Sequence, residues 1–390
     1  MKNNIKTIIL IVLIFIFIII IIHQQILLKK LHNKVKVAFV YIGDIGDFGW
    51  TYAHEAGRIQ LRNNFKNLEI IYRESVSPEN FTNIVKDLIE KEKCKIIVST
   101  SYSFDSYVIK LADLYPDIYF LSCAGMTAKK NLIPYFIDVY QIYYLNGLIS
   151  GGLSKNGKVG YIGGYKIPEL IRHINAFTIG LKEVNPDAQV FIYWLNSWYS
   201  PIKTSNIAQK MIEQNIDIIA YTEDSSSIPT TCQKYYEKTG RKVYTFSHYS
   251  PMDKFGSDVI VSGQLVNWGL IYTNLFSKIL SGKIEPKLHY WFANSNAAIF
   301  GKNYSCMISD EAKEILKNKK IKINSKVTNL YDYIIQRYDQ IKDPLISFDP
   351  FTGPLYSNKN ELKILNKERA GLKDLLTMDW FVPSIFEIDY

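Results

Sequence analysis

Residues 34–65 read KVKVAFVYIGDIGDFGWTYAHEAGRIQLRNNF, and they contain the first α/β unit of the chain. Residues 34–43 are rich in β-branched and aromatic side chains and end in a glycine, which is typical of a short buried strand. Residues 51–65 have apolar side chains at helical spacing. A strand, a glycine-rich turn and a helix in this order predict the start of a parallel βαβ series.

The same alternation continues along the chain in two successive series. The first series adds expected strands at 68–75, 94–101 and 117–125 and expected helices at 81–93 and 107–116. The second series has expected strands at 158–164, 188–197, 216–224 and 242–247 and expected helices at 168–186, 205–215 and 232–240. We therefore predict an α/β protein with two lobes, each a parallel sheet flanked by helices. Ligands of such sheets bind at the carboxyl ends of the strands, so the lobes are expected to enclose a cleft.

The amino terminus carries much of the positive charge of the chain. Residues 1–36 hold six lysines and no acidic residue, which leaves +3 of the net charge of +9 for the rest. This small remainder does not indicate a nucleic-acid partner. Residues 8–22 are continuously apolar, a length between that of a secretory signal and the roughly 20 residues of a membrane span.

The residues around this apolar run decide how it is interpreted. No small-residue cleavage site follows it, and the first cysteine is Cys94, so no lipid-attachment cysteine is present. We therefore expect a retained signal anchor within residues 1–33, with a cleaved signal peptide as the alternative. Lysines on both sides of the run leave its orientation undecided.

The composition and the motifs exclude several functional classes. Hydrophobic residues make up 47% and charged residues 21%, as expected of a folded chain, and four cysteines without a CxxC motif exclude a zinc ribbon. The glycines at 43, 46 and 49 do not satisfy the dinucleotide pattern GxGxxG. HExxH and GxSxG are absent, and His173 is expected to be a surface or packed histidine of a helix rather than a ligand-binding residue. The sequence therefore predicts no catalytic residues, no cofactor and no metal.

Two tryptophans occupy comparable positions in the two series. Trp50 follows the first strand at a glycine-rich turn, and Trp198 follows the strand at 188–197. If the lobes are related, the two indoles lie on opposite sides of the cleft and form a slot for a flat ligand. Stacking on such rings is worth about 1–3 kcal/mol per base. The alternative is that each tryptophan belongs to the core of its own lobe.

The chain also resembles a known family along almost its whole length. The stretches VAFVYIGDIGDFGWTYAHEAGR (37–58) and IPELIRHINAFTIGLKEVNPDAQV (167–190) are similar to the basic membrane protein family of substrate-binding proteins. These purine nucleoside receptor-like proteins serve ABC importers. Further similar stretches follow in the same order at 196–203, 222–229, 266–272 and 375–382. The resemblance implies a type I periplasmic-binding fold that holds a purine base or nucleoside between one aromatic residue from each lobe.

The resemblance implies a set of ligand-binding residues. Trp50 and Trp198 match the two aromatic positions, and Asp47 matches an acidic position near the pocket, although a helix N-cap is the alternative for it. The remaining implied residues are Ser101, Tyr102, Glu169, Arg172, Asn175, Thr222 and Asp224, with Glu223 in the same loop. Glu169, Arg172 and Asn175 are spaced to share one helix face, and a structural role between the lobes or in capping the helix is the alternative for them.

Some positions depart from the family pattern. Val139 and Gln141 stand where arginine and glutamate are usual, and Lys166 replaces a proline before the helix. Pro251 stands where an aspartate that binds sugar is typical, which favours a bare base or another flat heterocycle over a nucleoside.

The resemblance also implies an organisation and partners. We expect a first lobe at 35–150 completed by about 260–300, a second lobe at 151–258 completed by about 301–345, and a packed tail at 346–390. The expected protein is a monomer outside the cytoplasm, tethered to the membrane by its N-terminal segment, that delivers a purine-like ligand to ABC permease subunits. A membrane-anchored sensor of the same fold is the alternative function.

Overall fold

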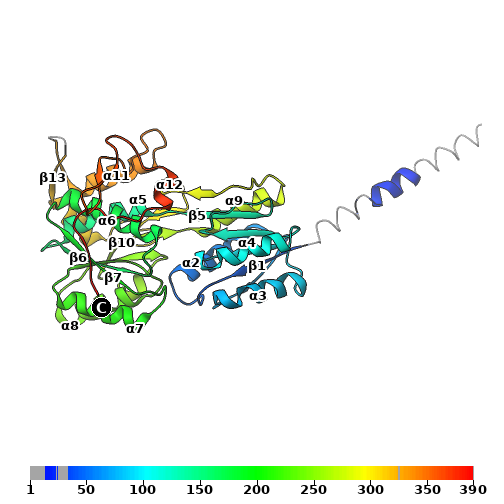
Figure 1. Cartoon of the computed structure of the whole chain (residues 1–390), viewed down its shortest axis with the longest axis horizontal. Helices are drawn as coiled ribbons and strands as arrows, with labels where there is room; N and C mark the ends of the chain where they lie inside the picture. The colour runs from blue at the N-terminus through cyan, green and yellow to red at the C-terminus, as the bar shows by residue number, and fades with distance from the viewer. Residues whose placement is uncertain (1–13, 23, 25–33, 324–325, 390) are drawn as a thin grey trace, which may run out of the picture.

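The computed structural model of the chain describes residues 14–22, 24, 34–323 and 326–389. Residues 34–323 and 326–389 form two α/β lobes side by side, with the blue and cyan elements in one and the green elements in the other (Figure 1). Residues 14–22 are helical. Within the described ranges, no helix is long and apolar enough to span a membrane. Most of the expected anchor at 1–33 lies outside the described residues.

The first lobe is built on a six-stranded parallel sheet in the order β11-β5-β4-β3-β1-β2. Its strands are β1 (Val35–Val40), β2 (Leu68–Arg73), β3 (Ile96–Ser99), β4 (Tyr119–Cys123), β5 (Leu132–Ile137) and β11 (His289–Trp291). Its helices are α2 (Trp50–Asn64), α3 (Pro78–Glu90), α4 (Asp105–Leu114) and α9 (Trp268–Leu280). The predicted parallel α/β organisation is confirmed for this lobe.

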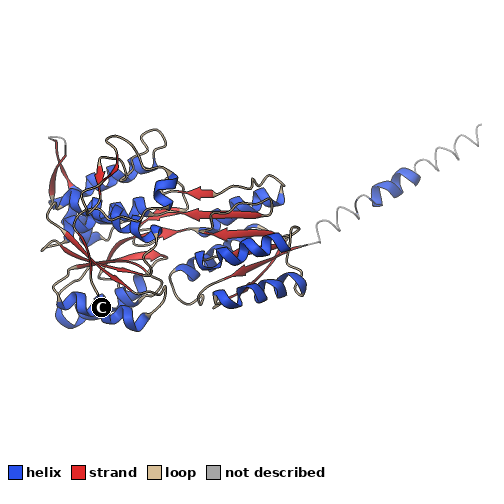
Figure 2. Cartoon of the chain, viewed as in Figure 1, coloured by secondary structure: helices blue, strands red, loops and turns tan. Residues whose placement is uncertain are grey.

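Alternate side chains of β1 enter two different cores. Val37 and Phe39 pack in the core that includes residues of α2 and α9, whereas Ala38 and Val40 pack in the core that includes residues of α3 and α4. Helices therefore cover both faces of the sheet, as Figure 2 shows. A strand buried on both faces is apolar along its buried part, which explains the continuous apolar run from Val37 to Tyr41.

The second lobe contains a parallel sheet in the order β17-β7-β6-β8 and a smaller sheet in the order β12-β10-β9. A parallel bridge between Ile218 and Tyr244 joins the two sheets. The strands are β6 (Lys158–Gly163), β7 (Gln189–Trp194), β8 (Ile218–Thr222), β9 (Thr245–Tyr249), β10 (Ile260–Val266), β12 (Ala298–Phe300) and β17 (Ile385–Glu387). The helices are α5 (Tyr140–Leu153), α6 (Pro168–Val184), α7 (Pro201–Glu213), α8 (Ser227–Thr239), α10 (Asp310–Asn318) and α11 (Leu330–Lys342).

Helices α5 and α6 cross at very short distance because glycines face each other. A Cβ on Gly147 of α5 would lie 2.0 Å from the carbonyl oxygen of Phe177, and a Cβ on Gly180 of α6 would lie 2.1 Å from that of Tyr144. Every residue of α5 is buried. This close packing of α5 and α6 begins directly after the point where the chain leaves β5 and enters the second lobe.

The chain crosses between the lobes after β5, between β10 and α9, and between β11 and β12. Helix α5 and strands β10 and β12 pack in the second lobe, although they fall within the ranges 35–150 and 260–300 expected for the first lobe. The expected boundaries differ here because a buried strand has the same sequence pattern whichever sheet it joins.

The C-terminal segment extends the second lobe. Strand β17 pairs in parallel with β7, and short elements precede it, namely β15 (Leu355–Tyr356), β16 (Leu362–Ile364) and α12 (Leu372–Leu376). A hairpin of β13 (Lys320–Ile323) and β14 (Lys326–Asn329) lies earlier in the chain.

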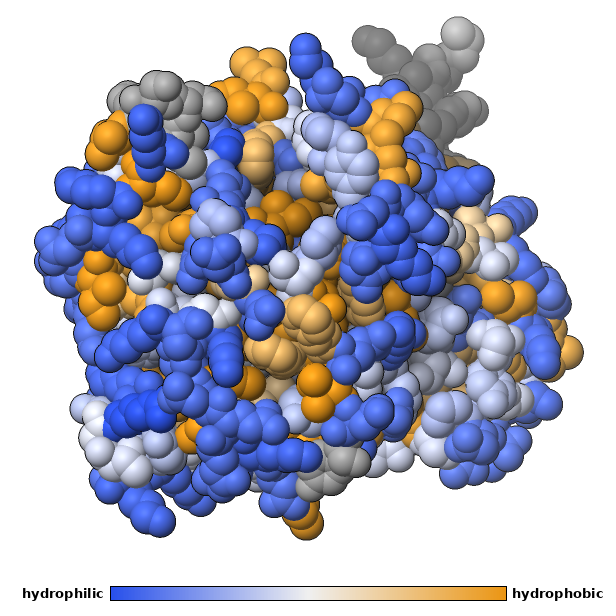
Figure 3. All heavy atoms as spheres, turned by 60° about the vertical axis from the view of Figure 1, so that its left-hand side comes forward, coloured by the Kyte–Doolittle hydropathy of each residue, from blue (hydrophilic) through white to orange (hydrophobic). Residues whose placement is uncertain are grey.

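The face of the molecule seen in Figure 3 is mainly hydrophilic, with apolar residues in small groups.

Candidate functional site

A narrow pocket lies between the two lobes at the carboxyl ends of their strands. Its space is about 390 Å³, including the open mouth. The first lobe contributes Ile42, Trp50, Ser101, Tyr102 and Ala124, and the second lobe contributes Glu169, Trp198, Asp224 and Tyr249. Six of the ten residues predicted for the site are therefore brought together in one cavity.

The loops that follow the strands position these side chains. Ala124 directly follows β4 and Tyr249 ends β9, and both have a positive φ, 59° and 57°. A positive φ is unusual for residues other than glycine and is found where the surrounding structure fixes the backbone. The backbone is therefore held in uncommon conformations on both sides of the pocket.

Trp50 is held by two rings of the first lobe, His54 and Trp268, and by Tyr249 of the second lobe. It starts helix α2, and its indole N–H donates to the carbonyl oxygen of Thr100 at 2.5 Å. The centroid of its ring lies 4.6 Å from that of His54, 5.4 Å from that of Trp268 and 5.0 Å from that of Tyr249. The side chain is half-buried, so Trp50 is a packed residue and also lines the pocket.

Trp198 sits on a loop with much less support. It is half-buried after β7, near Asn196, which has a φ of 54°. Its ring makes an edge-to-face contact with Tyr165, with the centroids 5.0 Å apart. It also lies against Gly164, where a Cβ would approach the ring to 2.7 Å. The carbonyl oxygen of Trp198 accepts the backbone N–H of Asp224 at 2.8 Å.

Two carboxyl groups, those of Glu169 and Asp224, line the pocket, and none of its nine described lining residues is cationic. Glu169 accepts the hydroxyl of Tyr249 at 3.1 Å. Burial raises the pKa of Glu169, and burial together with the nearby Asp47 and Glu223 raises the pKa of Asp224 well above its usual value. The pocket is therefore acidic and aromatic.

Ser101 and Tyr102 lie where the sequence predicts them, at the end of β3. Ser101 is buried, and its hydroxyl accepts the backbone N–H of Ser103 at 3.2 Å. Tyr102 is 58% exposed, so it lies at the mouth of the pocket.

Asp47 does not line the pocket but caps the helix that carries Trp50. Its carboxylate accepts the backbone N–H groups of Gly49, Thr51 and Tyr52, each at 2.9 Å. These donors are among the amides that a helix N-terminus leaves without partners. Gly49 occupies the N-cap position of α2, and Asp47 supplies the capping side chain from two residues earlier. The bonds of Asp47 are therefore those of the alternative capping role.

Thr222 and Glu223 are also outside the pocket lining. The hydroxyl of Thr222 is hydrogen-bonded to those of Tyr143 at 2.7 Å and Tyr161 at 2.5 Å. Glu223 accepts the backbone N–H and the hydroxyl of Ser225, and burial raises its pKa to about 8. Both residues have their polar groups engaged inside the second lobe.

Arg172 lines a neighbouring cavity of about 730 Å³, which shares Tyr102, Ala124 and Glu169 with the pocket. Its guanidinium forms a buried ion pair with Asp138. Burial opposes ionisation of Asp138, but Arg172 lowers its pKa below the usual range.

Asn175 lies in neither cavity. It donates to the carbonyl oxygen of Trp380 at 2.8 Å and accepts the N–H of Val382 at 2.9 Å. It therefore holds the C-terminal segment on α6, a structural role rather than a place in the pocket.

Tyr249, Ile42 and Ala124 line the pocket but were not among the residues expected from the sequence. Ile42 directly precedes the glycine-rich turn, and Tyr249 follows the predicted strand at 242–247, so their positions at strand ends were visible in the sequence. Nothing in the chain marks Ala124, because a small apolar residue after a strand is common.

The comparisons with known proteins agree with this arrangement. The family model for PnrA-like ABC transporter substrate-binding proteins matches residues 34–332. The chain is 28% identical over 353 residues to a purine-binding protein of Brucella abortus, covering 90% of this chain and 93% of that protein. It is 26% identical over 280 residues to a putative ABC transporter glucose-binding protein of Haloferax volcanii, covering 72% and 70%.

Solved structures show the same fold. A solute-binding protein of an ABC transporter system from Aeropyrum pernix superimposes with a TM-score of 0.64 at 13% identity, covering 80% of this chain and 91% of the other. A second such protein, from Conexibacter woesei, gives a TM-score of 0.58 at 15% identity, covering 79% and 96%.

The family match covers most of the chain, and the two lobes with a pocket between them are the architecture of periplasmic solute-binding proteins. Proteins of this family bind small molecules outside the cytoplasm, work with permease subunits and are not enzymes. The chain therefore belongs to the Bmp family of PnrA-like ABC transporter substrate-binding proteins.

Proposed function

We propose that this substrate-binding protein captures a purine base or a similar flat heterocycle between Trp50 and Trp198 and delivers it to an ABC importer. The observation that carries this proposal is that a tryptophan from each lobe lines the same narrow pocket. Stacking of a base on an aromatic ring contributes about 1–3 kcal/mol, so two rings and a few hydrogen bonds support micromolar or tighter binding. The purine-binding relative in Brucella abortus supports the same ligand class.

The charge of the pocket narrows the ligand further. Glu169 and Asp224 can accept hydrogen bonds from ring N–H and amino groups, while the described lining offers no cation for a phosphate. Guanine carries adjacent N–H and amino donors, so it suits this lining better than adenine. A nucleotide would place its phosphate charge near two carboxyl groups at a cost in free energy.

Isothermal titration calorimetry tests the proposal with guanine, guanosine, adenine, adenosine, guanosine monophosphate and D-glucose. We expect binding of the bases or nucleosides, at least tenfold weaker binding of the monophosphate, and no heat with glucose. Glucose serves as the comparison because one relative is a putative glucose-binding protein. Binding of glucose without binding of any purine would overturn the proposal.

Membrane attachment and oligomeric state belong to the same proposal. The apolar run at 8–22 supports a membrane tether in place of a lipid anchor. One chain supplies both walls of the pocket, so a monomer is sufficient for binding. Recovery of the full chain in the membrane fraction after carbonate washing, and a mass near 45.1 kDa by light scattering in detergent, after subtraction of the bound detergent, are the expected results. Release by carbonate or a stable dimer would contradict these two points.

A further inference from the structure

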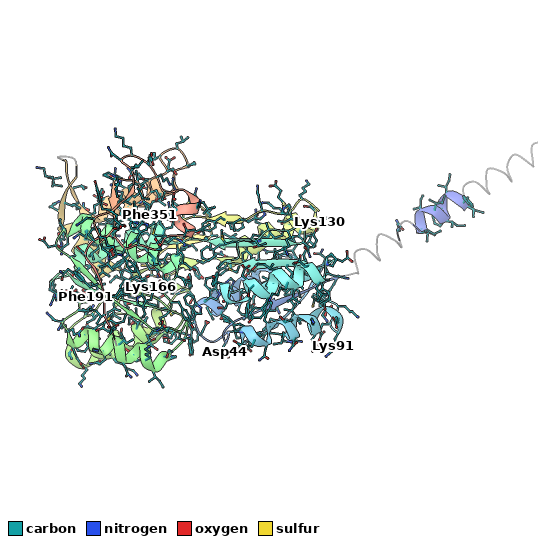
Figure 4. All side chains as sticks on the ribbon, viewed as in Figure 1. Asp44, Lys91, Lys130, Lys166, Phe191 and Phe351 are labelled. Carbon is teal, nitrogen blue, oxygen red and sulfur yellow. The ribbon has the colours of Figure 1, made fainter. Side chains whose placement is uncertain are left out.

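A second cavity lies between the lobes, next to the pocket that Trp50 and Trp198 line. Its space is about 730 Å³, including the open mouth. In Figure 4, Asp44 marks the end of the first lobe that faces the second lobe, and Lys91 marks the far end. Asp44 follows β1, and residues 124–126 follow β4 of the same parallel sheet, so these residues of the second cavity lie at the end that faces the second lobe.

The second cavity is mostly apolar, and both lobes contribute to it. Met126, Phe136 and Leu288 come from the first lobe, and Ile167, Pro168 and Leu376 come from the second. Any group bound there therefore contacts both lobes, and its burial favours the closed arrangement of the cleft.

The pocket and the second cavity are neighbours. Tyr102, Ala124 and Glu169 line both of them. The ring centroid of Phe136, in the second cavity, lies 6.5 Å from that of Trp50, in the pocket. Rings at this distance are in contact. A ligand in the pocket can therefore extend a substituent past the three shared residues into the second cavity.

Two polar side chains of the second cavity, Arg172 and Tyr290, are already bonded within the protein. The Nε of Arg172 donates to Asp138, and its other two nitrogens donate to the carbonyl oxygen of Leu375 at 3.3 Å and to the hydroxyl of Tyr290 at 3.2 Å. The hydroxyl of Tyr290 donates in turn to Asp138 at 2.6 Å. Each guanidinium nitrogen thus has a partner, and Asp138 balances the positive charge.

This arrangement favours an apolar substituent over a hydroxylated or charged one. Hydroxyl groups buried against apolar side chains lose their hydrogen bonds to water, and each one left without a partner costs free energy. An apolar group has no such cost, and its burial contributes in proportion to its area. A ribose would carry its hydroxyl groups into a space where Arg172 and Tyr290 already have partners.

We propose that the second cavity is a subsite for an apolar substituent, so that the ligand of this protein is a flat heterocycle with an uncharged, apolar side group. The ring stacks between Trp50 and Trp198, and the side group occupies the second cavity. This inference rests on the proposed function, because it takes the pocket as the place of the ring. It adds the chemical class of the group that the ring carries.

Calorimetry with ligands that share one base tests the subsite, and these are guanine, N²-benzylguanine, 9-benzylguanine and guanosine. The benzyl compounds are isomers that carry the same apolar group on different rings of the base. We expect at least one isomer to bind more tightly than guanine, by about tenfold or more, because burial of the benzyl group contributes in proportion to its area. Guanosine should bind no more tightly than guanine, because its ribose offers hydroxyl groups in place of the apolar group.

Two substitutions fill the second cavity from opposite lobes. Leu376 ends α12 and Leu288 directly precedes β11, and both side chains are half-buried. Leu376→Trp and Leu288→Trp should each remove the gain from the benzyl group. Their affinity for guanine should be that of the natural chain, which also shows that the variants fold. Leu372→Trp is the matched control and should keep the gain, since Leu372 starts the same helix, is 39% exposed and lies outside the described lining.

The outcomes separate this inference from the proposed function. The subsite is overturned, while the proposed function stands, if guanine binds and neither benzyl isomer binds more tightly. Tighter binding of guanosine than of both isomers, or a gain that persists in both tryptophan variants, has the same consequence. A failure of guanine and all of its derivatives to bind would overturn the proposed function, and this inference with it.

Discussion

The two tryptophans of the pocket differ in how firmly they are held. Trp50 begins a helix, donates a hydrogen bond to Thr100 and touches several rings, whereas Trp198 lies on a loop and has one described ring contact, with Tyr165. Because each ring contact restricts the side chain, the wall of the first lobe is preorganised and the wall of the second lobe is adaptable. Ligand binding in such a pocket loses little conformational entropy at Trp50, while Trp198 can still adjust to ligands of different shape.

The largest expected effect is that of Trp50→Ala, because this substitution removes both packing and stacking. We expect the free energy of unfolding to fall by about 2–3 kcal/mol and the dissociation constant for guanine to rise about 5- to 150-fold. Urea titration and calorimetry measure the two quantities. Trp50→Phe is the control and should recover most of the stability. A stability unchanged by Trp50→Ala would show that the ring cluster does not hold this wall.

Trp198→Ala sharpens the comparison because it should affect binding alone. We expect the same 5- to 150-fold loss of affinity, since one stacking surface is removed, but a change in unfolding free energy below about 0.5 kcal/mol. Calorimetry measures the affinity and urea titration measures the free energy of unfolding. Unchanged affinity in this variant and in Trp50→Ala would refute the aromatic clamp, and a large loss of stability would make Trp198 a core residue.

His54→Gln tests whether a neutral histidine packs behind Trp50, because such a histidine makes the stability of the protein depend on pH. His54 stacks on Trp268 at 3.9 Å, and burial holds its pKa well below the usual value. The folded state keeps His54 neutral, whereas the unfolded chain protonates it below a pKa of about 6.5. The free energy of unfolding is therefore unaffected by this histidine above that pH and falls as pH drops below it. At pH 5 this loss is up to about 2 kcal/mol, and the variant should lack it.

Urea titrations of His54→Gln at pH 7.5 and pH 5 measure this difference. His289→Gln is the control at the sheet edge, where burial lowers the histidine pKa more weakly, and it should reduce the pH effect less. An identical loss of stability on acidification in the natural chain and in His54→Gln would contradict a neutral histidine behind Trp50.

The smallest expected effect is that of Tyr165→Ala, which removes the ring beside Trp198. Tyr165 is itself 37% exposed, so we expect a two- to threefold weaker affinity, about 0.5 kcal/mol, and no change in stability. Tyr199→Ala is the control, because Tyr199 neighbours Trp198 in the chain but is 54% exposed. A loss of affinity in Tyr165→Ala as large as that in Trp198→Ala would mean that Trp198 depends on its neighbouring ring as strongly as Trp50 does.

The site could be predicted from the sequence only in part. Residues at the end of predicted strands or directly after them, such as Ser101 and Trp198, lie in the pocket because parallel strands direct their carboxyl ends to one edge. Asn175 and Thr222 were expected in the pocket but bond to the C-terminal segment and to buried tyrosines instead. Their partners lie far away in the chain, and spacing along one helix or strand does not show which distant segment packs against it.

The sequence by itself determined the two α/β series and the tryptophan at a strand end in each, because strand burial and helical periodicity are local properties. The tertiary structure decided which lobe takes α5, β10 and β12. It made Asp47 a helix cap and brought the backbone of Asp224 against Gly49 of the opposite lobe. Carboxyl groups at a turn have the same sequence pattern whether they bind ligand, cap a helix or join two lobes. Only the position of the opposite lobe, which depends on three chain crossings far apart in sequence, distinguishes these roles.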